Sequence, residues 1–342
     1  MTSRTGPPDP EPAGDTAAPP RQERSGYRHL FEQAAVGLLE LTFEGTILQI
    51  NASGASLLGY APEALLGRNV LSLTHPDDIN TTRAAFARVV RGETGVAVVE
   101  KRYLHMDGHV VWSRSRLSLL RNAQGEARSC VAVVADITEL KEIQFRLREA
   151  NTDLQATLEG GLLGLGLALE ARDLETSGHT QRVAALSVRL AGHLGLSPAQ
   201  TRELRHGAYL HDIGKLTIPD AILTKPGPLD AGEWAQMQTH AGAGHAMALR
   251  MPALAPGALL VIRHHHERWD GTGYPDRLAG EAIPLLARIF AVCDVYDALI
   301  SERPYKSAWT PEQALTELLA QRGRQFDAAV VDAFAELDPA AP

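Results

Sequence analysis

Seven histidine and aspartate side chains recur along the second half of the chain in the pattern of a metal centre. They are His179, His211, Asp212, His240, His265, His266 and Asp294. Imidazoles and carboxylates bind hard and borderline divalent metals, whereas a lone histidine is more often a structural residue. The two adjacent pairs suggest more than one ion, and two-metal sites commonly cleave phosphate esters. The chain must therefore fold so that these side chains share one cavity.

Two motifs surround these residues. Residues 210–215 read Leu-His-Asp-Ile-Gly-Lys, and residues 265–275 read His-His-Glu-Arg-Trp-Asp-Gly-Thr-Gly-Tyr-Pro. Together with residues 225–229 and 294–299, they resemble the signatures of the HD-GYP family, a branch of the HD-domain phosphohydrolases, from about residue 170 to 334. The resemblance implies hydrolysis of cyclic di-GMP to pGpG and, in many members, onward to GMP. Spacing alone predicts only a metal-dependent phosphohydrolase.

The resemblance also implies which residues bind metal. All seven side chains match ligand positions, and Asp212 is expected to bridge two ions. Glu175 lies four residues before His179, on what we expect to be the same helix, and favours a third ion. Its alternative role is a surface glutamate favoured by the helix dipole. The resemblance thus implies two or three divalent ions, with iron or manganese expected, and ligand type does not choose between these two metals.

The expected substrate contacts come from the same resemblance. Lys215 is expected to hold a phosphate oxygen or the leaving group. Tyr274, Arg303 and Lys306 match positions that contact the dinucleotide, where a ring suits guanine and cations suit phosphate. Asp212 and Lys215 are the expected catalytic residues, in a reaction where a metal-activated water attacks phosphorus.

Other polar residues near the motifs are expected to play supporting roles. Asp270 and Asp297 are candidates for orienting the ligand imidazoles, as metal sites commonly need. Glu170 is expected to be structural. His264 is expected to be structural or to support a ligand.

Composition limits the possible partners and location. A net charge of −8 argues against binding to nucleic-acid polymers or to an anionic membrane, because both need a basic surface. Two cysteines, Cys130 and Cys293, are too few for a disulfide framework and predict a cytoplasmic location. No stretch reaches the roughly 20 apolar residues needed to cross a bilayer.

The N-terminal part predicts a leader and a sensor domain. Residues 1–25 are rich in Pro, Gly, Ala and charge, which predicts disorder. Residues 26–140 contain short apolar runs between turns, which predicts an antiparallel sheet. Residues 51–53, 58–60, 75–78, 107–112 and 136–139 resemble a PAS domain. The resemblance implies an α+β fold for sensing or dimerisation, with an unknown ligand. Flavin photochemistry is not expected, because Val70 stands where light sensors have cysteine.

The rest of the chain reads as helical. Apolar residues over residues 141–160 follow a 3,4 spacing, which predicts a helical linker and favours a two-stranded coiled coil over a helix packed on its own domain. Residues 161–342 predict an all-α domain. We therefore expect a multidomain, dimeric, PAS-regulated cyclic di-GMP phosphodiesterase. The alternatives are an HD phosphohydrolase of another cyclic dinucleotide and a catalytically idle receptor.

Overall fold

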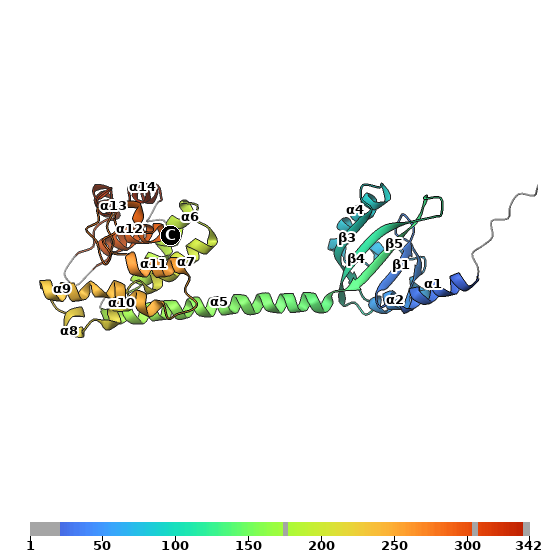
Figure 1. Ribbon diagram of the computed structural model, residues 1–342, viewed down its shortest axis with the longest axis horizontal. Helices are drawn as coiled ribbons and strands as arrows, with labels where there is room; N and C mark the ends of the chain where they lie inside the picture. The colour runs from blue at the N-terminus through green and yellow to red at the C-terminus, as the bar shows by residue number, and fades with distance from the viewer. Residues whose placement is uncertain (1–20, 174–176, 303–306, 338–342) are drawn as a thin grey trace, which may run out of the picture. The chain divides into compact units, whose positions relative to one another are not determined.

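Two compact units, Met1–Ala150 and Asn151–Pro342, make up the structure, a computed structural model. It describes residues 21–173, 177–302 and 307–337. Helix α5 (Thr138–Asp173) contains the boundary between the units (Figure 1). The linker helix expected over residues 141–160 lies within this longer helix.

Helix α1 (Arg21–Gln33) begins inside the segment expected to be disordered. The Asn51 side-chain amide donates to the backbone carbonyls of Phe31 and Val36, both at 2.9 Å, and so anchors the end of α1. A helix that is anchored at one end extends at little cost, because nucleation is its expensive step. The expectation of disorder is therefore wrong for residues 21–25, and residues 1–20 lie outside the described part.

An antiparallel sheet with strand order β2-β1-β5-β4-β3 forms the centre of the first unit. Its strands are β1 (Gly37–Leu41), β2 (Ile47–Ile50), β3 (Val96–Leu104), β4 (Val110–Arg121) and β5 (Ala127–Asp136). Its short helices are α2 (Ala52–Leu58), α3 (Pro62–Leu65), η1 (Val70–Leu73), η2 (Pro76–Asp78) and α4 (Ile79–Val90). Helix α4 packs on β3 and β4. Burial alternates along β3, as expected for a sheet with one covered face. The predicted α+β class is confirmed.

Helices form the second unit, and the described residues 177–302 and 307–337 contain no named strand. After α5 come α6 (His179–His193), α7 (Pro198–Leu210), η3 (Ile213–Thr217), α8 (Asp220–Leu223), α9 (Ala231–Met237), α10 (Thr239–Ala248), α11 (Pro256–His264), η4 (Gly280–Ala282), α12 (Leu285–Ile300), α13 (Pro311–Ala320) and α14 (Ala328–Glu336). The predicted all-α class is confirmed for these residues.

Helix α12 is the centre of this second unit. It packs against α6, α7, α11, α13 and α14, and its Phe290 and Tyr296 are almost completely buried. Such a helix is apolar nearly all round, so its buried Asp297 and half-buried Asp294 stand out as polar exceptions. Among the described helices, none is both long and apolar enough to cross a membrane.

Candidate metal centre

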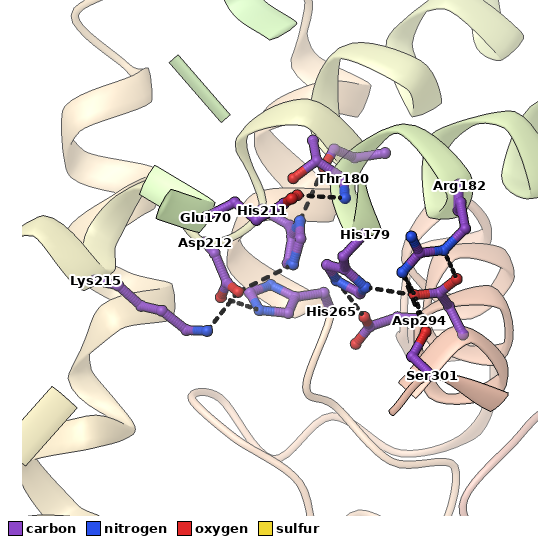
Figure 2. Close-up of polar contacts among 12 residues, drawn as sticks. Glu170, His179, Thr180, Arg182, His211, Asp212, Lys215, His265, Asp294 and Ser301 are labelled. Atoms are coloured by element: carbon purple, nitrogen blue, oxygen red, sulfur yellow. Dashed lines mark hydrogen bonds and ion pairs between the residues drawn. The ribbon is translucent and has the colours of Figure 1, made fainter. Parts of the chain in front are cut away.

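The seven expected ligands meet in one place, although they come from helices far apart in the sequence. His179 opens α6, His211 ends α7, Asp212 precedes η3, His240 lies in α10, His265 and His266 follow α11, and Asp294 lies in α12. Figure 2 shows the side chains of His211, Asp212 and His265 turned toward one another, with His179 and Asp294 beside them.

The ligands divide into two groups. One contains His179, His211 and Asp294, and the other contains Asp212, His240, His265 and His266. Within each group, one ligand atom from every residue lies within 4.8 Å of the others. This grouping agrees with the expectation of more than one ion.

The Asp212 carboxylate lies between the two groups. Its Oδ2 is 3.1 Å from His211 Nε2, and its Oδ1 is 3.3 Å from His240 Nε2. Oδ1 is buried and has no hydrogen-bond donor among the described residues. A buried carboxylate oxygen without a partner is costly, and a cation held by the second group would supply one. The arrangement fits the bridging role expected for Asp212.

Three of the imidazoles are oriented by the backbone carbonyl three residues earlier in the chain. The Nδ1 atoms of His211, His240 and His265 lie 2.8, 2.7 and 3.0 Å from the backbone carbonyls of Ala208, Met237 and Ile262. A carbonyl accepts only from an N–H, so each neutral ring carries its proton on Nδ1 and directs the Nε2 lone pair inward. His240 Nε2 and His265 Nε2 then face each other at 3.3 Å without a proton between them. A metal ion is the partner that two such lone pairs require.

His179 is oriented by a carboxylate. Its Nδ1 lies 2.8 Å from Asp297 Oδ2, and its Nε2 lies 3.3 Å from Asp294 Oδ1. Arg182 donates to both oxygens of Asp297, at 2.7 and 3.0 Å. A carboxylate behind a ligand imidazole fixes its tautomer and raises its basicity. Asp297 therefore has the supporting geometry expected from the sequence, and Arg182 is a residue that sequence reasoning missed.

Asp270 does not share that role. It accepts from the Thr272 hydroxyl at 2.6 Å and the Thr272 amide at 3.1 Å, as in a turn. His264 is grouped with other side chains than the ligands, and its Nδ1 lies 3.7 Å from Glu267 Oε1 and 3.6 Å from Asp276 Oδ2.

Electrostatics favour the metal-binding protonation states of four ligands, Asp212, His265, His266 and Asp294. Burial lowers the pKa of His265 well below its usual range and that of His266 to about 3. Burial alone would raise the pKa of Asp294, but the hydrogen bond and charge of His179 outweigh it and bring that pKa to about 2. Burial is likewise outweighed at Asp212 by His211 and Lys215, which keep its pKa well below normal. Metals bind neutral imidazoles and ionised carboxylates.

Lys215 lies against the bridging carboxylate. Its Nζ is 2.7 Å from Asp212 Oδ2, three residues back in the chain (Figure 2). Gly214 makes this turn possible, since a Cβ there would lie 1.9 Å from the His240 carbonyl oxygen. The lysine expected to meet substrate phosphate therefore lies beside the expected metal ligands.

Tyr274 lies on the second group's side of the site. Its ring centre is 4.7 Å from that of His266 and 6.3 Å from that of the half-exposed Trp234 in α9. The loop passes close to the backbone of His266 at Gly273. A residue with a Cβ would not fit there, because that Cβ would lie 2.6 Å from the His266 carbonyl oxygen. Tyr274 and Trp234 together form an aromatic wall, and sequence reasoning did not find Trp234.

A buried glutamate holds the Tyr274 loop in place. Glu267 is 4 % exposed and accepts from the backbone amides of Asp276 at 2.8 Å and Leu278 at 3.1 Å. Burial raises the pKa of this carboxyl group. Its position inside the His-His-Glu-Arg motif was the only sequence signal for this role.

The start of α6 corrects one expectation. Glu175 and His179 were expected on one helix, but α6 begins at His179 after Gly178, which has φ of 82°. Glu170 at the end of α5 accepts from the amides of Gly178 at 2.5 Å and Thr180 at 2.9 Å, which confirms its structural role (Figure 2). The expectation that Glu175 and His179 share one helix is therefore wrong, because Gly178, which stands between them in the sequence, adopts the left-handed conformation. Glu175, Arg303 and Lys306 themselves lie outside the described residues.

Comparison with known families identifies both units. The HD domain family matches residues 168–330, and the PAS fold family matches residues 47–134. The HD match contains all seven described ligands.

Curated relatives of the chain are phosphodiesterases. The 3'3'-cGAMP-specific phosphodiesterase 2 of Vibrio cholerae is 45% identical over 185 residues, 54% of this chain and 35% of the relative. The cyclic di-GMP phosphodiesterase response regulator RpfG of Xanthomonas campestris is 45% identical over 193 residues, 56% of this chain and 51% of the relative. A cyclic di-GMP phosphodiesterase of V. cholerae is 34% identical over 301 residues, 78% of this chain and 61% of the relative.

This chain spans less than two thirds of the length of each of these relatives. The similarity nevertheless extends over both matched domains, and the ligand-bearing motifs stand in the expected order. The chain therefore contains a PAS-fold domain followed by an HD domain, and this HD domain is of the HD-GYP type.

Proposed function

We propose that this protein is a metal-dependent phosphodiesterase that hydrolyses a cyclic dinucleotide, with cyclic di-GMP as its first candidate substrate. One observation carries the proposal: seven ligand side chains form two groups that share the Asp212 carboxylate. Paired metal sites are the usual solution for cleaving phosphate diesters. The names of the relatives support the same reaction class.

Divalent ions would be held by the two groups of ligands, with iron or manganese as the proposed metals. When bound, such ions supply Lewis acidity and an activated water. Glu175 remains the proposed ligand of a third ion.

Around this centre, the protein's own residues would bind and orient the substrate. Lys215 carries its charge beside Asp212, where it can meet a phosphate oxygen. The Tyr274 and Trp234 rings offer a surface on which a guanine base can stack. Arg303 and Lys306 remain proposed contacts for the phosphates.

The identities of the substrate and of the final product are further parts of this proposal. We propose cleavage of cyclic di-GMP to pGpG and on to GMP. A different cyclic dinucleotide is the second candidate, because the relatives include a 3'3'-cGAMP-specific enzyme. A catalytically idle receptor is the third candidate, and the complete set of described ligands speaks against it.

The test is product analysis on protein purified without oxygen. Cyclic di-GMP and 3'3'-cGAMP are each incubated with the protein and Fe(II) or Mn(II), and products are separated by chromatography. Asp212→Ala is the inactive variant, and His193→Ala is the matched control, because His193 pairs with Glu336 on the surface. Metal-dependent pGpG or GMP, absent only in Asp212→Ala, supports the proposal. Intact substrate in every condition contradicts it, and tight binding without turnover would favour the receptor.

Dimerisation and PAS control are part of the same proposal. Leu147 and Leu154 on α5 are each 68% exposed, and Ile143 is 55% exposed. They follow the 3,4 spacing of a coiled-coil seam, so a second copy of the chain is the proposed partner. Removing residues 1–150 should change activity or oligomeric state, and a protein unchanged in both would contradict PAS control. The cytoplasmic location remains a prediction from cysteine usage.

A further inference from the structure

Three side chains outside the two groups of catalytic ligands form a further group with metal-ligand chemistry. They are His264, which ends α11, Glu267, which lies in the His-His-Glu-Arg motif, and Asp276, two residues after Tyr274. One ligand atom from each lies within 4.8 Å of the others. An imidazole and two carboxylates are ligands that zinc accepts.

The His264 imidazole is buried and has an unpaired nitrogen. The residue is 7% exposed, and its Nδ1 has no hydrogen-bond partner among the described residues. This atom lies 3.7 Å from Glu267 Oε1 and 3.6 Å from Asp276 Oδ2, and both distances are too long for a hydrogen bond. A buried polar atom in this state is costly, so the arrangement indicates a partner among the three side chains.

The distances between these atoms fit a metal ion better than a water molecule. Two atoms bridged by a water, each at a hydrogen-bond length of about 2.8 Å, lie roughly 4.5 Å apart. Two ligands of a tetrahedral zinc ion, each at about 2.0–2.1 Å, lie roughly 3.4 Å apart. The observed 3.6 and 3.7 Å are closer to the zinc value. Zinc would therefore require only small shifts of these side chains.

Both carboxylates are held in place by other groups. The Glu267 oxygens accept from the backbone amides of Asp276 and Leu278, and Arg263 donates to both Asp276 oxygens at 2.7 Å. A carboxylate oxygen has two lone pairs, so one hydrogen bond leaves a lone pair for a metal. Metal sites commonly orient their carboxylate ligands with such hydrogen bonds.

The balance of charge also favours a cation. The Glu267 side chain is completely buried, and no lysine or arginine among the described residues forms an ion pair with it. Arg263 neutralises only the second carboxylate, that of Asp276. A buried carboxylate needs a compensating charge, which a divalent ion would supply. Asp276 is exposed, so an ion could enter from solvent beside it.

We propose that His264, Glu267 and Asp276 form a zinc site, with water as the fourth ligand. The ion would tie the end of α11 to the loop that presents Tyr274. The site is separate from the two groups of catalytic ligands, and the proposal does not depend on which reaction those groups perform.

The direct test is X-ray anomalous diffraction from crystals of the full chain, loaded with Zn(II) and then dialysed to remove unbound metal. We expect an anomalous peak about 2.0–2.2 Å from His264 Nδ1 and from an oxygen of each carboxylate. Peaks at the catalytic ligands alone, or a water in place of the ion, would overturn the proposal. This measurement needs neither a variant nor an active enzyme, so its failure is distinguishable from the absence of phosphodiesterase activity.

A zinc count in solution gives a second test. Protein is equilibrated with Zn(II), dialysed against a weak chelator and analysed for metal by mass spectrometry. Asp276→Asn should bind about one zinc ion fewer per chain than the parent, because one of three protein ligands is lost. Asp332→Asn is the matched control, since Asp332 also pairs with an arginine, Arg322, and should bind as much zinc as the parent.

His264→Gln distinguishes one shared ion from two separate effects. It should lose the same amount of zinc as Asp276→Asn, and the double variant should lose no more than either single variant. Zinc content equal to that of the parent in both folded single variants would contradict the site.

Discussion

At the scale of single residues, the metal centre depends on side chains behind the ligands as much as on the ligands. His179 is oriented by Asp297, and Asp297 is in turn held by Arg182. The ligand residues could be predicted from the sequence, because each stands in a recognisable motif. Arg182 could not, because it stands in no recognisable motif and nothing beside it in the sequence indicates a contact with a residue 115 positions later.

We expect Asp297→Asn to weaken metal binding by about 10–100-fold, because an amide orients the His179 imidazole less well and makes it less basic. Chelator competition on the purified protein would measure this. Asp332→Asn is the matched control, since Asp332 pairs with the exposed Arg322 away from the site. Equal affinities in the two variants would show that Asp297 does not support the centre.

At the scale of elements, close backbone approaches position the ligands. The 3,4 spacing of apolar residues over residues 141–160 predicted part of α5. The sequence did not predict that the chain leaves the helical conformation just before α6. The positive φ of Gly178 and the hydrogen bond from the Thr180 amide to Glu170 both depend on where α5 ends in space. Contacts of that kind leave no periodic pattern in the sequence.

Gly214→Ala should disturb the site through η3 and α10. A Cβ at residue 214 would lie 1.9 Å from the His240 carbonyl oxygen and 2.4 Å from the Gly244 amide nitrogen. We expect the free energy of unfolding to fall by about 1–3 kcal/mol, together with weaker metal binding as His240 moves. Gly192→Ala in α6, where a Cβ meets no atom within 4 Å, should instead stabilise the protein by up to about 1 kcal/mol. Urea unfolding would measure both changes, and equal effects would contradict this account.

In the first unit, the ion pair between η2 and β3 predicts acid sensitivity. The hydrogen bond from Arg102 lowers the pKa of Asp78 below its ordinary value of 3.8. A carboxyl group with a depressed pKa stabilises the fold above its unfolded pKa, and this stability is lost as pH falls through the folded value. Asp78→Asn should therefore lower the urea midpoint at pH 7, and the difference from the parent should shrink below about pH 4.

The control for this prediction is the neighbouring carboxylate. Asp77 also contacts Arg102, at 3.1 Å, but its side chain is 69% exposed. Solvent screens such a pair, so Asp77→Asn should change the midpoint much less. A difference between Asp78→Asn and the parent that stays constant with pH would contradict the assigned cause.

At the scale of the whole molecule, α5 is the one element within the described residues that belongs to both compact units. The paired substitutions Leu147→Glu and Leu154→Glu should convert a dimer into a monomer, because they place charge in the proposed seam. Light scattering after size-exclusion chromatography would measure the mass. The control pair Thr152→Glu and Gln155→Glu adds the same charge off the seam and should leave the mass unchanged. A parent protein that is already monomeric would contradict the proposed dimer.

The second half of α5 also contains four glycines, at residues 160, 161, 164 and 166. Only Gly166 is required by packing, since a Cβ there would lie 2.3 Å from the Tyr209 carbonyl oxygen, whereas the other three meet no atom within 4 Å. Each glycine in a helix costs roughly 1 kcal/mol relative to alanine. The stretch is therefore the least costly place for α5 to unwind, only a few residues before Glu170 and the α6 terminus that it caps. A signal that melts this turn would loosen His179 without touching any metal ligand directly.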